Sequence, residues 1–184
     1  MKRLLPLLFA ALALPAAAQR TNNPGEVSGP QQQRSWEEDE RRNRPESAVT
    51  LPPWPKRENL VEFHVSNATS FRFYVDAPSV SISDDNVVRF TLVARSAAGV
   101  DNITYEGIRC AEVQYRIYAY GQDGKWAARE SEWRDIEPMA IQRWHNELRQ
   151  RFFCRDRGTI MNAAEGVEAL RHGGLPGSAT RPGS

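Results

Sequence analysis

The sequence has few of the residues from which catalytic and metal sites are built. Its 184 residues include two cysteines and three histidines. They form no Cys-x-x-Cys pair and no pair of histidines four residues apart, and the chain contains no Gly-x-Ser-x-Gly elbow and no glycine-rich phosphate loop. These absences exclude the recognisable zinc hydrolases, serine hydrolases and P-loop enzymes, so we predict no metal ion and no cofactor.

An excess of charge of one sign is also lacking. Lys and Arg together number 24, and Asp and Glu together number 23. A chain so close to neutral has no electrostatic reason to bind nucleic acid or an anionic membrane surface. We therefore expect neither of these partners.

A long apolar run occurs at the N-terminus. Lys2 and Arg3 precede an apolar stretch over residues 4–14, and Ala16 and Ala18 supply the small residues that a signal peptidase accepts. The stretch is too short for a membrane span. We interpret residues 1–18 as a secretory signal peptide cleaved near Ala18, in preference to a buried core helix, and predict an exported chain without a transmembrane span in its mature form.

Two polar segments flank the predicted domain. Residues 19–50 contain almost no apolar side chains and cannot bury enough surface to offset the entropy lost on ordering, so we predict a disordered polar linker rather than exposed helical turns. Residues 173–184 are expected to form a flexible tail. The domain should span residues 51–172, and LPPWP at 51–55 should enter it as an extended segment anchored by Trp54.

Apolar residues alternate through most of the domain. The alternating positions are Val61, Phe63 and Val65, then Phe71, Phe73 and Val75, then Val80 and Ile82, then Val88, Phe90, Leu92 and Ala94, then Ile103 and Tyr105, then Val113, Tyr115, Ile117 and Ala119, with Trp126 after the last turn. Clusters of Gly, Asn and Asp separate these runs, and connections this short cannot make parallel crossovers. We therefore predict an antiparallel β-meander of about six strands with one apolar face.

The C-terminal third is predicted to cover that face. Pro138 suits the first turn of a helix, and an apolar stripe follows at helical spacing. Its members are Ile141, Trp144, Leu148 and Phe152. A second helix is expected from Thr159, as its cap, to Arg171, with Gly173 as its stop. The predicted class is α+β, with two C-terminal helices packed on one face of the sheet.

The two cysteines are placed for a crosslink. Cys110 ends a predicted strand, Cys154 ends a predicted helix, and an exported protein meets an oxidising environment. A catalytic thiol and two unpaired buried thiols are the alternatives. We predict a disulfide that joins the helix to the sheet.

A cluster of charged residues borders a glycine in a predicted strand. Glu106, Arg109 and Arg116 lie near Gly107, a position where a backbone or a ligand can approach closely. The favoured interpretation is a group of surface ion pairs beside a β-bulge, and the alternative is a ligand or partner site. In a structural role, Arg109 would be a buried or partly buried partner of Glu106 or of a backbone carbonyl.

Aromatic residues are dense around the same strands. Tyr118 and Tyr120 occupy alternate positions and are expected to share a face, which would provide a stacking platform for a sugar or a partner. Packing between helix and sheet is the favoured interpretation for most aromatic residues, and the stacking platform is the alternative. His145 is expected to be an exposed helix residue, because His145 and Glu147 point to different sides of a helix and cannot hold one ion.

Several stretches of the chain resemble one protein family. They are FRFYVDAPSVSISDDNVVRFTLVARSAAGVDNITYEGIRC, EVQYRIYAYG and AAEGVEALRHGG, of which NITYEGIRC and VVRFTLVARS are the most specific. On these stretches the chain resembles the CNP-like family of exported proteins from Gram-negative proteobacteria. The resemblance covers residues 51–172. It implies an envelope location and the pair Cys110 and Cys154, and it brings no established activity with it.

Two functions from different classes stay open. The leading hypothesis is a non-enzymatic periplasmic accessory or binding module of the cell envelope, with an envelope protein or polysaccharide as partner. Its candidate binding residues are Glu106, Gly107, Arg109, Arg116, Tyr118 and Tyr120. The alternative is a hydrolase-like enzyme that acts on an envelope polymer through carboxylates such as Glu106 and Glu112. An enzyme needs a pocket with at least two titratable groups near one substrate atom, whereas a binding module needs an exposed groove or patch.

Overall fold

The computed structural model describes residues 45–129, 131–138, 143–156 and 158–178. The predicted signal peptide, the first part of the predicted linker and the end of the predicted tail lie outside the described residues. Within the described part, none of the helices combines the length and the apolar character that crossing a bilayer requires.

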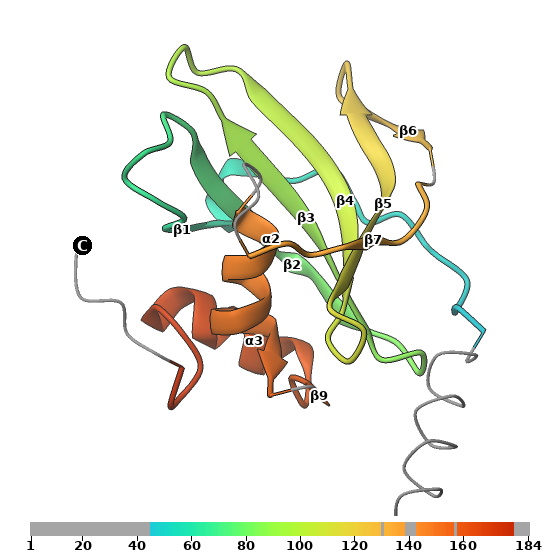
Figure 1. Cartoon of the computed structure of the whole chain (residues 1–184). Coiled ribbons are helices and arrows are strands. Elements are labelled where there is room, and N and C mark those ends of the chain that lie inside the picture. Colours follow the sequence, from blue (N-terminus) through green and yellow to red (C-terminus); the bar gives the residue numbers. More distant parts are fainter. Residues whose placement is uncertain (1–44, 130, 139–142, 157, 179–184) are drawn as a thin grey trace, which may run out of the picture. The chain divides into compact units, whose positions relative to one another are not determined.

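Seven strands form one antiparallel sheet (Figure 1). After a short 3-10 turn, η1 (Arg57–Asn59), they are β1 (Leu60–Phe63), β2 (Arg72–Ile82), β3 (Val87–Arg95), β4 (Asp101–Arg109), β5 (Gln114–Gln122), β6 (Lys125–Ala128) and β7 (Arg134–Asp135). Strands β1 to β6 are neighbours in sequence order, and β7 pairs with the part of β5 that β6 leaves uncovered. The structure confirms the predicted meander of six strands.

Residues 71–82, predicted as two short runs, form mainly one strand, β2. The register against β3 shifts after Asp76, around Pro78, which has no N–H to donate. Here the Ser79 hydroxyl donates to the Asp76 carbonyl at 2.6 Å and accepts the Thr91 N–H at 2.7 Å. This side chain supplies a hydrogen bond across the irregularity, so the strand continues past the proline.

Asp76 is a buried carboxylate at this irregularity. Its exposed fraction is 4%, and burial raises its pKa, although the N–H groups of Lys56 and Ser79 donate to it. Oδ1 has no hydrogen-bond partner among the described residues. A carboxyl whose pKa is raised by folding binds its proton more tightly in the folded protein, so this group makes the free energy of unfolding fall as the pH rises through the raised pKa.

We expect Asp76→Asn to be at least as stable as the wild type at pH 7. The amide keeps an oxygen for the two N–H donors and removes the buried charge. The advantage should shrink as the pH falls towards 3.8, the ordinary pKa of this group, because the wild-type carboxyl then takes up its proton. Thermal melts of both proteins over a pH series measure the difference, and a variant less stable than the wild type at pH 7 would contradict the prediction.

The helical layer consists of short elements. The first helix was predicted from Pro138, which the structure places in a turn; residues 139–142, Ile141 of the apolar stripe included, lie outside the described residues. The described helix α2 is Trp144–Glu147, and it continues into a π-helical turn, η2 (Leu148–Phe153). A small hairpin of β8 (Cys154–Arg155) and β9 (Gly158–Thr159) leads to α3 (Ala163–His172). Both helices lie on one face of the sheet, as predicted (Figure 1).

Asn162, and not Thr159 as predicted, caps the N-terminus of α3. Its Oδ1 accepts the N–H of Glu165 at 3.0 Å, and the Glu165 carboxylate accepts the N–H of Met161 at 2.6 Å. This exchange of side-chain acceptors satisfies N–H groups of the first turn, while Thr159 belongs to β9. Gly173 ends the helix in the left-handed conformation at a φ of 80°, as predicted.

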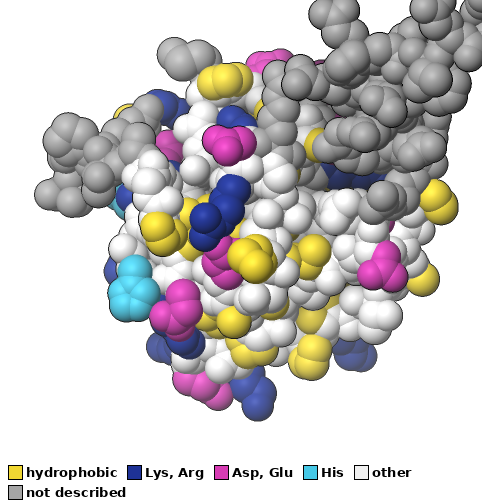
Figure 2. All heavy atoms as spheres, turned by 90° about the horizontal axis from the view of Figure 1, so that it is seen from below, with side chains coloured by type: hydrophobic (Ala, Val, Ile, Leu, Met, Phe, Trp, Pro, Cys, Tyr) yellow, Lys and Arg dark blue, Asp and Glu magenta, His cyan; other side chains and the backbone are white. Residues whose placement is uncertain are grey.

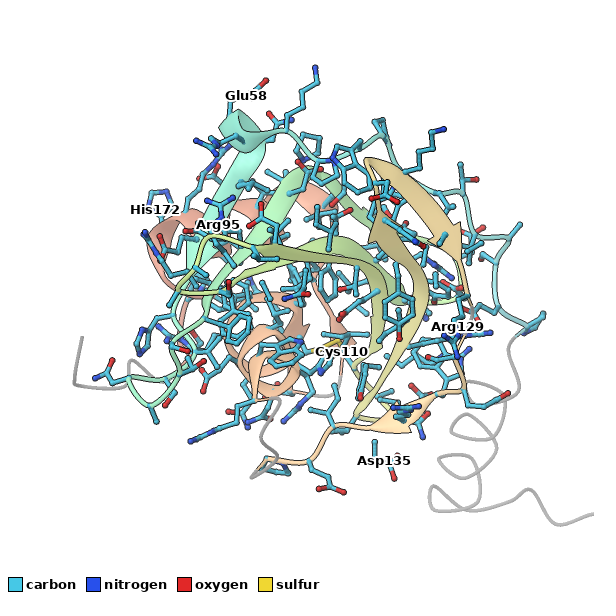
Figure 3. The ribbon with its side chains drawn as sticks, turned by 90° about the horizontal axis from the view of Figure 1, so that it is seen from above. Glu58, Arg95, Cys110, Arg129, Asp135 and His172 are labelled. Atoms are coloured by element: carbon cyan, nitrogen blue, oxygen red, sulfur yellow. A yellow bond between two sulfur atoms is a disulfide. The ribbon has the colours of Figure 1, made fainter. Side chains whose placement is uncertain are left out.

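The main core lies between the sheet and the helical layer, and the sheet curves around the helices (Figure 3). Aromatic rings join the two layers: Phe152 packs edge-on against Phe63 with ring centroids 5.8 Å apart, and Phe153 packs against Phe90 at 5.0 Å. Burying a side chain of this size contributes about 1.5–3 kcal/mol. These contacts make the face that carries the helices the main apolar face of the sheet, although the prediction of a single apolar face is wrong, because a second buried cluster lies on the opposite face.

Cys110 and Cys154 form the predicted disulfide, with Cα atoms 5.6 Å apart. Cys110 follows β4 and Cys154 follows η2 directly, so the bond joins the helical layer to the sheet. Both residues are buried, and Figure 3 shows Cys110 in the interior. The crosslink therefore holds this end of β4 against the core.

Residues 45–55, which we call the strap, cover the opposite face of the sheet, which we call the outer face. Figures 1 and 3 both show the strap on the side away from the helices. Val49 and Leu51 pack on a second buried cluster, formed by Tyr105, Tyr118 and Ala119. The predicted linker included residues 45–50, but these residues pack on the sheet because the outer face has an apolar surface of its own.

Trp54 anchors the end of the strap, as predicted. Its ring contacts the ring of Trp126, with centroids 5.3 Å apart. The indole N–H of Trp126 donates to the Pro52 carbonyl at 2.8 Å. Side chain and backbone together thus fix the point where the chain leaves the outer face and enters β1.

The first residues of the predicted tail also belong to the folded part. Leu175 is buried, and its N–H donates to the Arg151 carbonyl at 2.7 Å. Arg151 in turn donates to the Gly173 carbonyl at 2.6 Å. Residues 173–178 therefore pack on η2, and the domain extends beyond the predicted limit at residue 172.

The described surface seen from below carries mixed side chains (Figure 2). Apolar groups are scattered there among acidic and basic ones. The exposed large apolar residues are Phe71, Val100, Tyr120 and Met161, which belong to four separate parts of the chain. The described residues therefore offer charged and polar sites rather than one large apolar patch.

Candidate functional site

Gly107 lies in the middle of β4, on the outer face. It pairs with Arg89 of β3 on one side and with Arg116 of β5 on the other. A Cβ atom at this position would lie 2.7 Å from the Tyr118 hydroxyl oxygen and 2.8 Å from Val87 Cγ1. The predicted close approach is present, and side chains of the neighbouring strands make it.

A β-bulge in β5 separates the two tyrosines that were predicted to share a face. Tyr105 pairs with Ala119, whereas Glu106 pairs with Ile117, so Tyr118 is the extra residue. Tyr118 contacts Tyr105 on the outer face, at 5.8 Å between ring centroids. Tyr120 pairs with Thr104 of β4, and both residues lie on the face that carries the helices. The predicted platform of Tyr118 and Tyr120 is therefore wrong.

Three side chains from β3 and β5 converge on one carboxylate of the strap, and we call this group the Glu46 site. Arg116 Nη1 donates to Glu46 Oε2, and the Tyr118 hydroxyl donates to Glu46 Oε1. Arg89 Nη2 lies 3.4 Å from the same Oε1. The Glu46 side chain is 17% exposed and that of Arg89 is 3% exposed, so these charge-assisted contacts are largely shielded from water.

Asp85 holds Arg89 in position. Two hydrogen bonds join them, from Arg89 Nη2 at 2.6 Å and from Nη1 at 3.2 Å, and the N–H of Ser47 also donates to Asp85, at 2.8 Å. Burial alone would raise the pKa of the Asp85 carboxyl, but the bonds from Arg89, Ser47 and Val87 outweigh it and hold that pKa below its ordinary value. Asp85 is therefore the permanent counter-ion of Arg89.

Tyr118 is a proton donor in this site. Burial, and then its hydrogen bond to Glu46, raises the pKa of the phenol, so the hydroxyl stays protonated. The guanidinium carbons of Arg89 and Arg116 lie 5.4 Å and 5.5 Å from the centre of the Tyr118 ring. Cation–π attraction therefore adds to the hydrogen bonds that bring these side chains together.

Arg109 and Arg116 extend the cationic surface towards Trp133. Arg109 lies over the Trp133 ring at 4.1 Å from its centroid, and Arg116 lies at 6.0 Å. The Arg109 side chain is partly exposed, so a bound molecule can reach it. Arg109, Arg116 and Trp133 form a partly exposed cationic and aromatic surface beside the buried Arg89 and Tyr118, with chemistry suited to an anionic group.

Glu106 is not part of that surface. It is 1% exposed, on the helical face, where its carboxylate accepts Thr104 Oγ1 at 2.6 Å and contacts His145 Nε2 at 2.8 Å. Tyr120 pairs with Thr104 and therefore lies on the helical face too. The interpretation of Glu106 and Arg109 as surface ion-pair partners is wrong, because positions three apart in a strand point to opposite faces.

His145 is buried, and the expectation that it is exposed is wrong. Its ring stacks on Tyr115 with centroids 3.7 Å apart, and its exposed fraction is 2%. The single turn of α2 directs His145 towards the sheet, where Glu106 supplies its polar partner. The pair joins the helical layer to β4 through the core.

Glu106 and Glu112 do not form a pair on one surface. Glu112 belongs to the turn between β4 and β5, whereas Glu106 is enclosed beneath α2. Among the residues that the structure describes, no group of three or more His, Cys, Asp and Glu side chains is arranged to hold a metal ion.

A polar groove lies at the disulfide end of the molecule. Its volume is about 500 Å³, and its lining residues are Glu147, Gln150, Arg151, Cys154, Arg155, Asp156, Leu175, Pro176, Gly177 and Ser178. Arg155 is already paired with Glu165, and Arg151 with the Gly173 carbonyl. The groove therefore offers less convergent chemistry than the Glu46 site.

A protein-family model, described as the CNP1-like family, matches residues 39–171. The chain belongs to the CNP1-like family. The CNP1-like match begins ahead of residue 51 and so includes Glu46 and the rest of the strap, in agreement with their packing on the sheet. Searches of curated proteins and of solved structures gave no match to the chain.

Proposed function

We propose that this CNP1-like protein is an exported accessory or binding module of the cell envelope, located in the periplasm, that binds an anionic group on a partner. The single observation that carries the binding role is the convergence of Arg89, Arg116 and Tyr118 on one carboxylate. The N-terminal sequence supports export, and the Cys110–Cys154 disulfide suits an oxidising compartment.

The hydrolase alternative has less support. An enzyme of that kind needs two titratable groups that reach one substrate atom. Glu106 is closed off from solvent and hydrogen-bonded to Thr104 and His145, so a polymer chain has no access to it. A binding role requires no access to Glu106, because its donors lie on the outer face.

The proposal predicts that the mature protein begins at Gln19. Removing Lys2 and Arg3 with the signal peptide leaves 22 basic and 23 acidic residues, a net charge of −1. N-terminal sequencing of protein recovered from a periplasmic fraction checks the cleavage site. An intact Met1 terminus in the membrane fraction would contradict the export part of the proposal.

Arg109→Ala should remove partner capture and leave the fold nearly as stable as the wild type. Among the described residues, the partly exposed guanidinium loses its contact with Trp133, worth about 0.5–1 kcal/mol. Arg129→Ala is the matched control, because Arg129 is exposed and follows β6 (Figure 3). Affinity capture from envelope extract with the mature proteins, alongside thermal melts, gives both readouts. Equal capture by the wild type and Arg109→Ala would exclude this surface as the binding site.

A further inference from the structure

We propose that the Glu46 site is a peptide-binding site, which the strap occupies until a partner replaces it. The proposal rests on the binding role above and names the ligand class: an extended peptide segment with a carboxylate followed by apolar side chains three and five residues later. The carboxylate of the partner takes the place of the Glu46 carboxylate.

The donor set is that of a carboxylate receptor. Arg116 binds one oxygen of Glu46, and Tyr118 and Arg89 bind the other. Charge-assisted hydrogen bonds to both oxygens fix the position and the plane of a carboxylate. All three donors contact the carboxylate of Glu46, a group that an acidic residue of another chain can also supply.

The domain positions Arg89 and Tyr118 through contacts with residues outside the strap. Asp85 holds Arg89 through bonds of 2.6 Å and 3.2 Å. The Tyr118 ring packs against Tyr105 and fits above Gly107, where a side chain would collide with its hydroxyl. A preorganised site loses little conformational freedom on binding, which favours affinity. The site is therefore expected to persist when the strap leaves.

Ahead of its anchor at Trp54, the strap has few attachments to the outer face. Among the described residues it joins no strand of the sheet. Besides the bonds of Glu46, the Ser47 N–H donates to Asp85 and the Pro52 carbonyl accepts from Trp126. Val49 and Leu51 are only partly buried. Another extended segment can supply each of these contacts.

The strap shows which pattern a partner must match. Glu46 enters the carboxylate receptor, and Val49 and Leu51 pack on the cluster of Tyr105, Tyr118 and Ala119. Ser47 contributes its backbone N–H to Asp85, which any residue except proline can do. The ligand class is therefore an extended Glu-x-x-Val-x-Leu segment.

The test uses the complete mature chain with Glu46→Ala, Val49→Ser and Leu51→Ser, which removes the side chains that hold residues 46–51 and leaves the Trp54 anchor in place. A fluorescent synthetic peptide, PESAVTLPPW, corresponding to residues 45–54, should bind this variant at least tenfold more tightly than it binds the wild type. The same peptide with Glu46→Gln should bind the variant about tenfold more weakly, because the charge-assisted bonds are lost.

Two additions to the variant assign the binding to the site. Arg116→Ala should abolish binding of the peptide, and Arg129→Ala should leave it unchanged. If the variant does not fold, the wild type decides: excess peptide should speed hydrogen exchange of the Ser47 amide, because the strap leaves Asp85, and the Gln peptide should not.

Equal binding of the Glu and Gln peptides overturns the proposal, as does absence of both binding and faster exchange at Ser47. The wild type could also self-associate, and Glu46→Gln could abolish that association. This result would assign the site to the strap of a second copy and would overturn the proposal. Capture that depends on Arg109 together with failure of the peptide would leave the proposed function standing and remove this inference alone.

Discussion

Cys110→Ser and Cys154→Ser are each expected to melt roughly 10–20 °C below the wild type. The disulfide spans a sequence separation of 44 residues. Removing a loop constraint of that size from the unfolded chain costs about 4 kcal/mol in the chain-entropy model. Thermal melts without reductant measure the loss.

The double cysteine variant provides the control for this prediction. Either single substitution removes the same constraint, so Cys110→Ser with Cys154→Ser should melt close to the single variants. Additive losses from the two changes would show that packing, and not the crosslink, sets the effect. Alkylation of both thiols in the native wild type without reductant would contradict the disulfide itself.

Arg89→Ala is expected to destabilise the protein by about 3–5 kcal/mol, because it leaves a buried carboxylate without its partner. Asp85 is 1% exposed on its side chain and receives two hydrogen bonds from Arg89. Glu46 and Tyr118 would lose a cationic neighbour at the same time. Urea unfolding of the variant and the wild type measures the difference.

Arg95→Ala is the matched control for Arg89→Ala, since both arginines belong to β3 and both pair with an aspartate. Arg95 is 24% exposed and its partner Asp101 is 33% exposed, so water can replace the lost contact. We expect little change in the midpoint for Arg95→Ala. Equal losses of stability for the two variants would show that burial does not increase the contribution of the Arg89–Asp85 pair to stability.

The sheet and its helical cover could be predicted because their signals are local. Strict alternation of apolar residues defined the strands, and short polar turns between them required antiparallel neighbours. The cap of α3 is also present in the sequence, as the Asn162-Ala-Ala-Glu165 pattern of a capping box, and this pattern favours Asn162 over Thr159. The capping-box rule is therefore enough to place the start of α3 from the sequence.

The Glu46 site could be predicted only in part, because it joins distant segments. Arg116, Gly107 and Tyr118 were candidates, but Glu46 lay in a stretch whose composition favoured a linker, and a polar composition does not reveal a docking strap. Arg89 could have been recognised from the sequence, because a charge within the apolar run VVRFTLV indicates a buried ionic partner.

The faces of β5 could not be predicted, because a bulge is invisible to a rule of alternation. One extra residue at Tyr118 moved Tyr120 to the other side of the sheet. The burial of His145 has a similar origin, since its orientation depends on where the chain enters α2 and on the polar partner that Glu106 provides. Both features are set by tertiary contacts rather than by local sequence.

The strap has a consequence for how the protein is produced and handled. A recombinant chain shortened to begin at residue 51, where the sequence alone would place the domain boundary, lacks Glu46 and Val49. Its outer face would expose the tyrosine cluster beside an Arg116 that has lost its bond to Glu46, a surface that favours aggregation and non-specific adsorption. Expression and crystallisation should therefore retain the chain from residue 39 onward, where the family match begins.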